Sequence, residues 1–287
     1  MSREANAERS TLPIFVGGTG RSGTTIVGRL LGRHPDYEII PVEARFHSSQ
    51  DGLPAVLARR DTPETFVKRV IEKWYDPPGG SPKLAAFVER DALDTALWRF
   101  SETASVDLHT AARTLIEELF DGYAHSMGKR GWVEMTPPNV LWGAPWLTQL
   151  FPELRLVHVV RDGRDVACSL VNLGWVPDIE QALRWWETRM LQAHELCKTV
   201  PPRSLHAVSF ERLMVGDRAT SLRGLLDFLS WGEAPEVERF FERRMKPEDA
   251  HVGRWQSDLS GKESEFVCIE YEEILVRLRA EGALVPF

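Results

Sequence analysis

The sequence of 287 residues has few cysteines and no long apolar run. The three cysteines, Cys168, Cys197 and Cys268, are too few and too widely spaced for a disulfide framework or a thiolate metal site. No apolar stretch reaches about 18 residues, the minimum for a membrane-spanning helix. Residues 1–10 are polar and carry both charge signs, so they lack the apolar stretch of a signal peptide. We therefore expect a cytoplasmic protein with no bound metal and no membrane span.

Basic residues are also fewer than acidic residues. The chain has 35 Lys and Arg against 42 Asp and Glu, a formal net charge of −7, which excludes a generally basic nucleic-acid binder. Its 43% apolar and 27% charged residues are usual for a globular domain and give no support for disorder or a fibrous repeat. Single α/β domains often reach this length. We expect one domain over residues 1–287. The sequence does not indicate how many copies of the chain associate.

The beginning of the chain reads as a strand, a helix and a second strand. Pro13–Val16 is a short apolar run that ends at a glycine pair, which is typical of a buried parallel strand entering a turn. Apolar residues recur at helical spacing over Ser22–Leu31, and Tyr37–Pro41 reads as the next strand. A βαβ unit implies a parallel sheet and places ligands at the carboxyl ends of its strands.

Residues 44–130 carry helical periodicity, interrupted by the turn Pro77–Gly80. We expect this segment to be a helical insertion that shapes an acceptor pocket and acts as a lid. The α/β pattern then resumes, and the apolar run Leu154–Val160 predicts a central strand. The fold class is therefore α/β, a parallel sheet flanked by helices with a helical insertion. Later elements are predicted as helices at 179–199, 221–229 and 266–279 and strands at 132–133 and 205–208.

The most informative segment is the loop between the first strand and helix, Gly17-Gly18-Thr19-Gly20-Arg21-Ser22-Gly23-Thr24-Thr25. Glycines let the backbone turn tightly so that successive amides face an anion, and the following helix adds positive potential. Gly18 and Gly23 have the spacing of the nucleotide triphosphate loop G-x-x-x-x-G-K-[ST], but Thr24 occupies the lysine position. Because that lysine holds the β and γ phosphates, its absence argues against ordinary ATP or GTP hydrolysis. A purely structural turn is the alternative.

A second candidate anion site follows the central strand. Arg161 comes directly after that strand, and Ser169 lies about two turns along the next helix. A guanidinium group offers a planar fork to a phosphate, and a serine hydroxyl offers a further donor. The alternative is that Arg161 and Arg164 pair with Asp162 and Asp165 on the surface. Two anion sites on one parallel sheet suit a nucleotide phosphorylated at both ends of its ribose.

The two motifs resemble those of the sulfotransferases that use 3′-phosphoadenosine 5′-phosphosulfate (PAPS), most closely the tyrosylprotein and bacterial branch. Gly20–Thr25 is similar to the 5′-phosphosulfate loop of that family, and Arg161 with Ser169 to its 3′-phosphate motif. The resemblance implies a P-loop NTPase-like fold, no metal requirement, and in-line transfer of the sulfuryl group to an acceptor hydroxyl or amine. The other product is adenosine 3′,5′-bisphosphate (PAP).

Position by position, the resemblance implies roles for individual residues of the loop. Arg21, Ser22, Gly23, Thr24 and Thr25 would bind the 5′-phosphosulfate, and Arg21 would also stabilise charge on the leaving phosphate. In the same way, Arg161 and Ser169 would bind the 3′-phosphate.

The resemblance also implies a general base. Glu43 falls where the tyrosylprotein branch places that carboxylate, and a positioned base contributes about 10² to 10⁴ in rate. The alternative for Glu43 is a salt bridge with Arg45. His47 is a second candidate base, with a solvated loop histidine as the alternative.

Near the end of the chain, Gly253-Arg254-Trp255 resembles the segment that closes over the nucleotide in many relatives. An ordinary loop anchored by a buried Trp255 is the alternative reading. If the resemblance holds, Gly253 and Arg254 belong to the nucleotide site.

The sequence departs from the family pattern at three points. Met135 stands where relatives usually have a lysine that contacts the transferring group, and losing one such donor costs about 10² to 10³ in rate. Either Arg45, Lys129 or Arg130 replaces that lysine, or transfer is slow or altered. Phe210 stands where tyrosine is common. The membrane anchor of the tyrosylprotein enzymes is missing, so we do not expect a secretory-protein substrate.

The leading reading is a PAPS-dependent sulfotransferase. A phosphonucleotide-binding protein with altered catalysis is supported by Met135, and a P-loop kinase-like phosphoryl transferase is disfavoured by Thr24. By family analogy, the expected acceptor is a hydroxylated small molecule, such as a natural product, a glycan or a glycolipid. Most of the ten tryptophans are expected in the core, for example Trp185 and Trp186 within one helical pattern. The alternative is that tryptophans, Trp175 among them, line an apolar or aromatic acceptor pocket.

Overall fold

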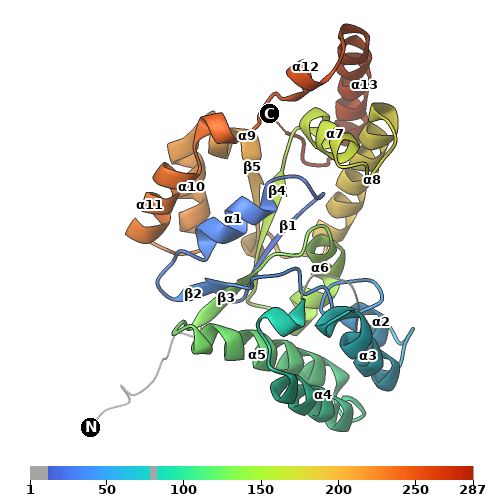
Figure 1. Ribbon diagram of the computed structural model, residues 1–287, viewed down its shortest axis with the longest axis vertical. Helices are drawn as coiled ribbons and strands as arrows, with labels where there is room; N and C mark the ends of the chain where they lie inside the picture. Colours follow the sequence, from blue (N-terminus) through green and yellow to red (C-terminus); the bar gives the residue numbers. More distant parts are fainter. Residues whose placement is uncertain (1–11, 78–82, 287) are drawn as a thin grey trace.

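The structure is a computed structural model that describes residues 12–77 and 83–286. Most of the predicted turn Pro77–Gly80 lies outside the described residues. Five parallel strands form one sheet in the order β2-β3-β1-β4-β5, with helices on both faces (Figure 1). This order confirms the predicted α/β class of the P-loop NTPase-like kind. The strands are β1 (Ile14–Gly18), β2 (Tyr37–Ile39), β3 (Gly131–Glu134), β4 (Arg155–Val160) and β5 (Leu205–Ser209).

Alternating side chains of β1 supply two separate cores. Ile14 and Val16 point to one face of the sheet, and Phe15 points to the other, because successive side chains of a strand point in opposite directions. The first face also buries Val27 and Phe241. The helices on this face are α1 (Thr24–Leu31), α9 (Phe210–Met214), α10 (Arg218–Phe228) and α11 (Pro235–Arg244).

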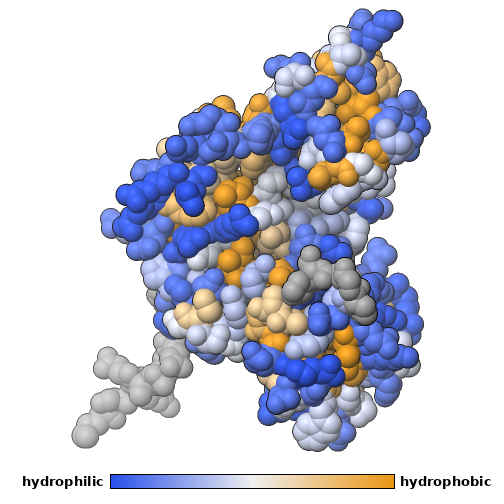
Figure 2. Space-filling model, in the orientation of Figure 1, coloured by the Kyte–Doolittle hydropathy of each residue, from blue (hydrophilic) through white to orange (hydrophobic). Residues whose placement is uncertain are grey.

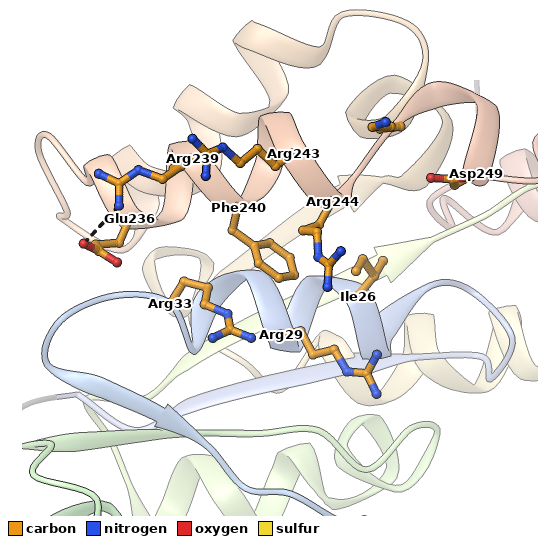
Figure 3. A pocket seen from close by; sticks show the side chains of 10 residues that line it. Ile26, Arg29, Arg33, Glu236, Arg239, Phe240, Arg243, Arg244 and Asp249 are labelled. Atoms are coloured by element: carbon orange, nitrogen blue, oxygen red, sulfur yellow. Dashed lines mark hydrogen bonds and ion pairs between the residues drawn. The ribbon is translucent and has the colours of Figure 1, made fainter.

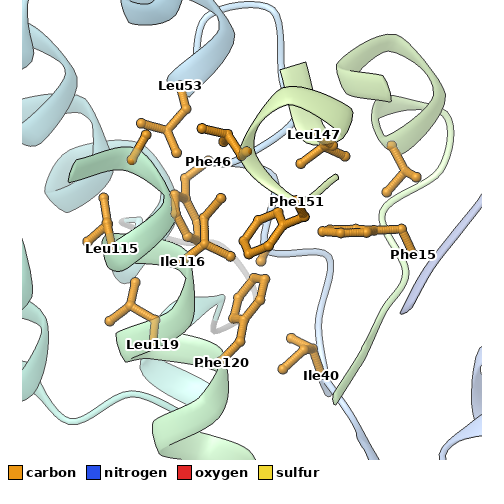
Figure 4. Packing of buried hydrophobic residues seen from close by; sticks show 14 of the residues in the cluster. Phe15, Ile40, Phe46, Leu53, Leu115, Ile116, Leu119, Phe120, Leu147 and Phe151 are labelled. Carbon is orange, nitrogen blue, oxygen red and sulfur yellow. The ribbon is translucent and has the colours of Figure 1, made fainter. Parts of the chain in front are cut away.

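On the opposite face, aromatic side chains from several elements pack around Phe15. Phe46, Phe120 and Phe151 meet there with aliphatic residues of the covering helices (Figure 4). The helices of this part are α2 (Leu53–Leu57), α3 (Pro63–Arg69), a π-helix (Val70–Tyr75), a 3₁₀ turn (Leu84–Ala86), α4 (Arg90–Ala104), α5 (Leu108–Ser126) and α6 (Asn139–Leu150). The helices predicted for residues 44–130 are thus present in the described part, and the role of the segment as a lid stays a prediction.

A third core lies beyond the carboxyl end of β4. Val160 packs there with Trp186 and Tyr271. Its main helices are α7 (Gly163–Asn172), α8 (Ile179–Cys197) and α13 (Gly261–Ala280), and the smaller elements are 3₁₀ turns at Pro202–Ser204 and Pro247–Asp249 and α12 (Trp255–Asp258). Among the described residues, no helix combines the length and apolarity that crossing a membrane requires.

The strand order decides which loops meet. Because all the strands are parallel, the loops that follow them lie along one edge of the sheet. The loop after β1 lies between the segments that follow β3 and β4, its two neighbours. In open α/β sheets, ligands bind at this carboxyl edge.

Candidate functional site

A cavity of about 400 Å³ opens at the carboxyl edge of the sheet. Its volume lies in the range of about 300 to 1,000 Å³ that small-molecule sites occupy. Cationic, hydroxyl, carboxylate and indole groups all contribute to its wall. The lining residues are Thr19, Gly20, Arg21, Gly23, Thr24, Thr25, Ile26, Glu43, Arg45, Pro137, Pro138, Asn139, Arg161, Trp175 and Trp185.

The loop after β1 takes a conformation that depends on glycine at two positions. A Cβ at Gly18 would lie 2.2 Å from Ser22 Oγ and 2.9 Å from the Val159 carbonyl oxygen. Gly23 has a φ of 91°, and a Cβ there would lie 2.3 Å from the Phe210 ring. Gly23 is also the N-cap of α1 and supplies no side-chain cap, so the first amides of the helix remain available to an anion.

Three predicted anion-binding residues meet beside this loop. The Arg21 Nε–H donates to Ser169 Oγ at 3.0 Å, and Arg161 Nη1 donates to the Arg21 carbonyl oxygen at 3.1 Å. The structure therefore brings the two sequence motifs into direct contact. Ser22 Oγ and Arg161 Nε are buried and have no hydrogen-bond partner among the described residues. Because unpaired buried polar groups cost free energy, these atoms favour an additional polar ligand.

Arg161 is a buried cation that connects three parts of the chain. Besides the loop, its Nη2 donates to the carbonyl oxygens of Ala250 at 3.3 Å and His251 at 2.9 Å. Its guanidinium carbon lies 4.8 Å from the centroid of the Phe210 ring. Burial lowers the pKa of Arg161, while the charge of the nearby Asp165 raises it. Arginine stays protonated in proteins, so this side chain presents a poorly hydrated positive charge beside the cavity.

The segment that contains Gly253 and Arg254 is fixed beside the site but does not line the cavity. Asp165 accepts the Gly253 N–H at 2.8 Å and the Trp255 N–H at 3.2 Å. Burial raises the pKa of Asp165, and these two hydrogen bonds lower it. Arg254 forms an ion pair with Asp258, with an N–O distance of 2.7 Å. Trp255 is buried, so the predicted anchored loop is present, and its closure over a nucleotide stays a prediction.

Glu43 and Arg45 line the cavity as an ion pair. Arg45 Nη2 contacts Glu43 Oε2, and its Nε donates to the same oxygen at 3.1 Å. The predicted salt bridge is therefore present. It also holds the Glu43 carboxylate at the cavity wall, where a general base would have to lie.

His47 lies elsewhere. It is fully buried, its Nε2 lies 3.2 Å from Glu134 Oε2, and its ring centroid lies 5.5 Å from that of Phe120. The expectation of a solvated loop histidine is wrong, because aromatic rings and the end of β3 enclose the imidazole. His47 does not line the cavity, so it cannot contact an acceptor there without rearrangement.

The structure also selects among the candidate replacements for the missing lysine. Met135 is buried, and its Sδ lies 3.9 Å from Thr25 Oγ1. Lys129 and Arg130 precede β3, at the amino edge of the sheet, and Lys129 Nζ donates to the Pro35 carbonyl oxygen at 3.0 Å. A strand of four residues spans about 13 Å, so both lie far from the carboxyl edge. Of these three candidates, only Arg45 lines the cavity.

Sequence reasoning missed Asn139 as a residue of the cavity wall, and it expected Trp185 in the core, whereas Trp185 packs against the core and also lines the cavity. Asn139 follows the segment after β3, and its Nδ2 donates to Ser49 Oγ at 2.6 Å. Trp175 and Trp185 bring indole rings to the wall, whereas Trp186 is fully buried in the core as expected. The sequence signal that could have identified Asn139 is its position shortly after β3, a strand next to β1. Within residues 12–77 and 83–286, no group of three or more His, Cys, Asp or Glu residues could hold a metal ion.

Comparison with protein families identifies the family of the chain. A sequence model of the sulfotransferase family matches residues 13–234. Protein-tyrosine sulfotransferase A of Caenorhabditis elegans is 22% identical over 222 residues, which cover 75% of this chain and 49% of that protein. Protein-tyrosine sulfotransferase of Drosophila melanogaster is 22% identical over 275 residues, or 86% of this chain and 48% of that protein. The chain spans about half the length of these curated relatives.

Two solved structures share the fold. The sulfotransferase domain of the Synechococcus PCC 7002 olefin synthase aligns with a TM-score of 0.55 at 18% identity, covering 96% of this chain and 98% of that one. The sulfotransferase domain from the curacin biosynthetic pathway aligns with a TM-score of 0.51 at 19% identity, covering 88% and 84%. At such identities the likeness supports the fold alone.

Proposed function

The chain belongs to the sulfotransferase family, and we propose that it is an enzyme of sulfuryl transfer whose donor is PAPS and whose acceptor is a hydroxyl or amine. One observation carries the proposal: Arg21, Arg161 and Glu43 line the same cavity at the carboxyl edge of the sheet. Two cations suit a phosphorylated donor, and a carboxylate suits an acceptor that must lose a proton.

The donor fits the polar groups of the loop. The amides at the start of α1, the hydroxyl of Thr25 and the Arg21 guanidinium would bind the 5′-phosphosulfate, since all of them border the cavity. The unpartnered Arg161 Nε and Ser22 Oγ, with Ser169 beside Arg21, offer further polar contacts to a second phosphate. When bound, the donor supplies a sulfuryl group attached to a phosphate leaving group.

The remaining groups suit the proton and charge changes of an in-line displacement. Glu43 would take the proton of the acceptor hydroxyl as the new S–O bond forms and the bond to the leaving phosphate breaks. Arg21 and Arg45 would stabilise the negative charge that develops on the leaving oxygen. In this proposal, Arg45 supplies the positive charge that a lysine at position 135 supplies in relatives.

The acceptor would bind against Trp175 and Trp185. Their indole rings provide an apolar surface next to Arg21, whose guanidinium carbon lies 6.0 Å from the centroid of the Trp175 ring. Such a wall suits an aromatic or extended apolar acceptor, which agrees with the expectation of a hydroxylated small molecule. The names of the curated relatives favour a second candidate, a tyrosine side chain of a protein, which carries the same phenolic hydroxyl.

The experiment uses PAPS labelled in its sulfuryl group and a panel of phenols, sugar alcohols, amines and tyrosine peptides. The proposal predicts label in one acceptor class with the wild-type protein and a large loss with Glu43→Gln. Equal transfer by both proteins would remove Glu43 from the mechanism. A label that enters only tyrosine peptides would replace the small-molecule acceptor with a protein one.

A further inference from the structure

A second and larger hollow lies beside the candidate active site, between α1 and α11. It encloses about 930 Å³ and is lined by six cationic residues and only two acidic ones, Glu236 and Asp249. We call it the arginine groove. Figure 3 shows Phe240 and Arg244 extending from α11 toward α1, and Arg29 of α1 and Arg33 of the following turn lie on the opposite wall. The six cationic residues are Arg29, Arg33, Arg239, Arg243, Arg244 and Lys246.

The positive charge of the groove is not a consequence of composition. The chain has a formal net charge of −7, so acidic partners are in excess. Arginines elsewhere on the surface do find them, for example Arg90 with Asp94 and Arg277 with Glu187. In the arginine groove, only Arg239 has such a partner among the described residues, Glu236 at 3.4 Å. Figure 2 shows hydrophilic side chains over α11, with hydrophobic side chains between α11 and α1.

Helix electrostatics account for only part of this arrangement. Arg29 lies in the last turn of α1, and Arg243 and Arg244 lie in the last turn of α11, where cations stabilise the helix dipole. That effect acts on each helix separately and does not require the cations of both helices to converge. Like charges closer than the Debye length of about 8 Å repel one another, so the convergence costs free energy unless an anion is bound.

The shape of the groove indicates the kind of anion. Its floor is apolar, because Ile26 and Phe240 line it and the Arg33 guanidinium carbon lies 5.0 Å from the centroid of the Phe240 ring. Arg239 and Arg243 are one helical turn apart, about 6 Å along α11, and they face Arg29 in the last turn of α1 and Arg33 in the turn that follows it. Two facing rows of guanidinium groups match several closely spaced tetrahedral anions.

We propose that the arginine groove binds a small molecule that carries several phosphate or sulfate ester groups, at a site separate from the donor cavity. Ile26 lines both hollows, so the two ligands would lie on either side of the first turn of α1. The groove contains neither the phosphate loop nor Glu43, and its ligand would bind without reacting there.

The test is calorimetric titration of the full chain with inositol hexakisphosphate and, separately, with sucrose octasulfate, each with and without saturating adenosine 3′,5′-bisphosphate. The proposal predicts saturable binding that persists in the presence of the bisphosphate. Arg243→Gln with Arg244→Gln would weaken that binding about tenfold or more, because charge-assisted contacts are lost. The better-bound probe identifies the ester as phosphate or sulfate.

The matched control is Lys262→Gln with Arg279→Gln, which removes two exposed charges from α13. The control would leave probe affinity unchanged. An equal loss in both double variants would overturn the proposal, because the effect would then be one of net charge. Displacement of the probes by the bisphosphate, with parallel loss of bisphosphate affinity in Arg243→Gln with Arg244→Gln, would also overturn it. The groove would then be part of the donor site.

Discussion

At the scale of the residue, Arg161 illustrates how one side chain combines structure and binding. It donates to carbonyl oxygens of the loop after β1 and of the segment before Gly253, and it also lines the cavity. Its position after an apolar strand was readable from the sequence. Its contacts with Ala250 and His251, about 90 residues away in the chain, were not.

The first prediction concerns the removal of this side chain. Arg161→Ala should weaken binding of adenosine 3′,5′-bisphosphate by about 1.5–3 kcal/mol, because a charge-assisted contact is lost. It should also destabilise the fold by about 1–3 kcal/mol, because the three carbonyl oxygens lose their donor. Titration calorimetry and chemical unfolding measure the two effects.

Arg155→Ala is the control for Arg161. Arg155 is the first residue of β4, the strand that Arg161 directly follows, and it donates to the carbonyl oxygens of Phe228 and Glu153. The Arg155→Ala variant should be less stable than the wild-type protein and should keep its affinity for the bisphosphate. Unchanged affinity in Arg161→Ala as well would show that Arg161 is structural only.

The second prediction separates the two roles of Glu43. Glu43→Gln keeps a polar group next to Arg45 but cannot accept a proton at neutral pH. Turnover should fall by about 10² to 10⁴ with bisphosphate affinity nearly unchanged. Steady-state kinetics and titration calorimetry measure the two effects.

Glu118→Gln provides the comparison for Glu43. Glu118 pairs with Arg99 at 2.7 Å on the surface, away from the cavity. The Glu118→Gln variant should keep full activity. If Glu43→Gln behaves in the same way, Glu43 serves only to hold Arg45.

At the scale of the element, the loop after β1 depends on close packing between α1 and α9. Gly23 ends the loop with a positive φ and lies against the ring of Phe210, the first residue of α9. Phe210 thus occupies space that any side chain at position 23 would need. The aromatic ring at position 210 therefore supports the loop by packing, without a hydroxyl group.

The third prediction follows from this packing. Gly23→Ala should destabilise the protein by more than about 1 kcal/mol and abolish bisphosphate binding, because both the φ angle and the Phe210 ring oppose a Cβ. Gly122→Ala in α5 is the control, since a Cβ at that position would meet no neighbouring side chain within 4 Å. It should stabilise the helix by about 0.5–1 kcal/mol. Thermal unfolding of both variants measures the stability changes, and titration calorimetry measures bisphosphate binding. Retained binding in Gly23→Ala would contradict the prediction.

Local patterns predicted some elements well and missed others. The strand before the phosphate loop and the long helix α8 follow from short-range apolar patterns, and both were predicted within a few residues. Helix α11 was missed because only Val237 and Phe241 are buried in it, which is too few for a periodic signal.

The same limit applies to the site. The phosphate loop and Glu43 lie next to recognisable strands, so the sequence indicated them. Trp175 and Trp185 reach the cavity only through the packing of α7 and α8, and His47 is enclosed by rings from two distant segments, Phe15 and Phe120. Side-chain placement of this kind depends on tertiary contacts that one sequence does not display.

At the scale of the whole molecule, charge is unevenly distributed. The chain is acidic overall, yet the phosphate loop, Arg161 and the arginine groove concentrate positive charge on both sides of α1. Such local fields raise the concentration of anionic ligands near a site even on an acidic protein. The net charge of −7 is therefore compatible with an anionic donor.

The fourth prediction concerns the pH dependence of stability. His158 on β4 is fully buried, and this burial lowers its pKa from 6.5 to about 4. Between these values the unfolded chain binds a proton that the folded protein does not, so the free energy of unfolding decreases as pH falls from about 6.5 toward 4. The expected loss is about 3 kcal/mol.

Chemical unfolding at several pH values measures this loss. His158→Leu should flatten the pH dependence in this window, whereas His109→Leu, at an exposed position in α5, should leave it steep. An unchanged slope in His158→Leu would mean that another group causes the acid sensitivity.

The central claim is that the cavity binds a nucleotide phosphorylated at both ends of its ribose, as a PAPS-dependent sulfotransferase must. Calorimetric titration with adenosine 3′,5′-bisphosphate and with ATP, each with and without Mg²⁺, tests it most directly. The account predicts saturable binding of the bisphosphate that does not depend on Mg²⁺ and is stronger than that of ATP. No binding of the bisphosphate, or a preference for ATP with Mg²⁺, would contradict the account and favour a kinase-like phosphoryl transferase.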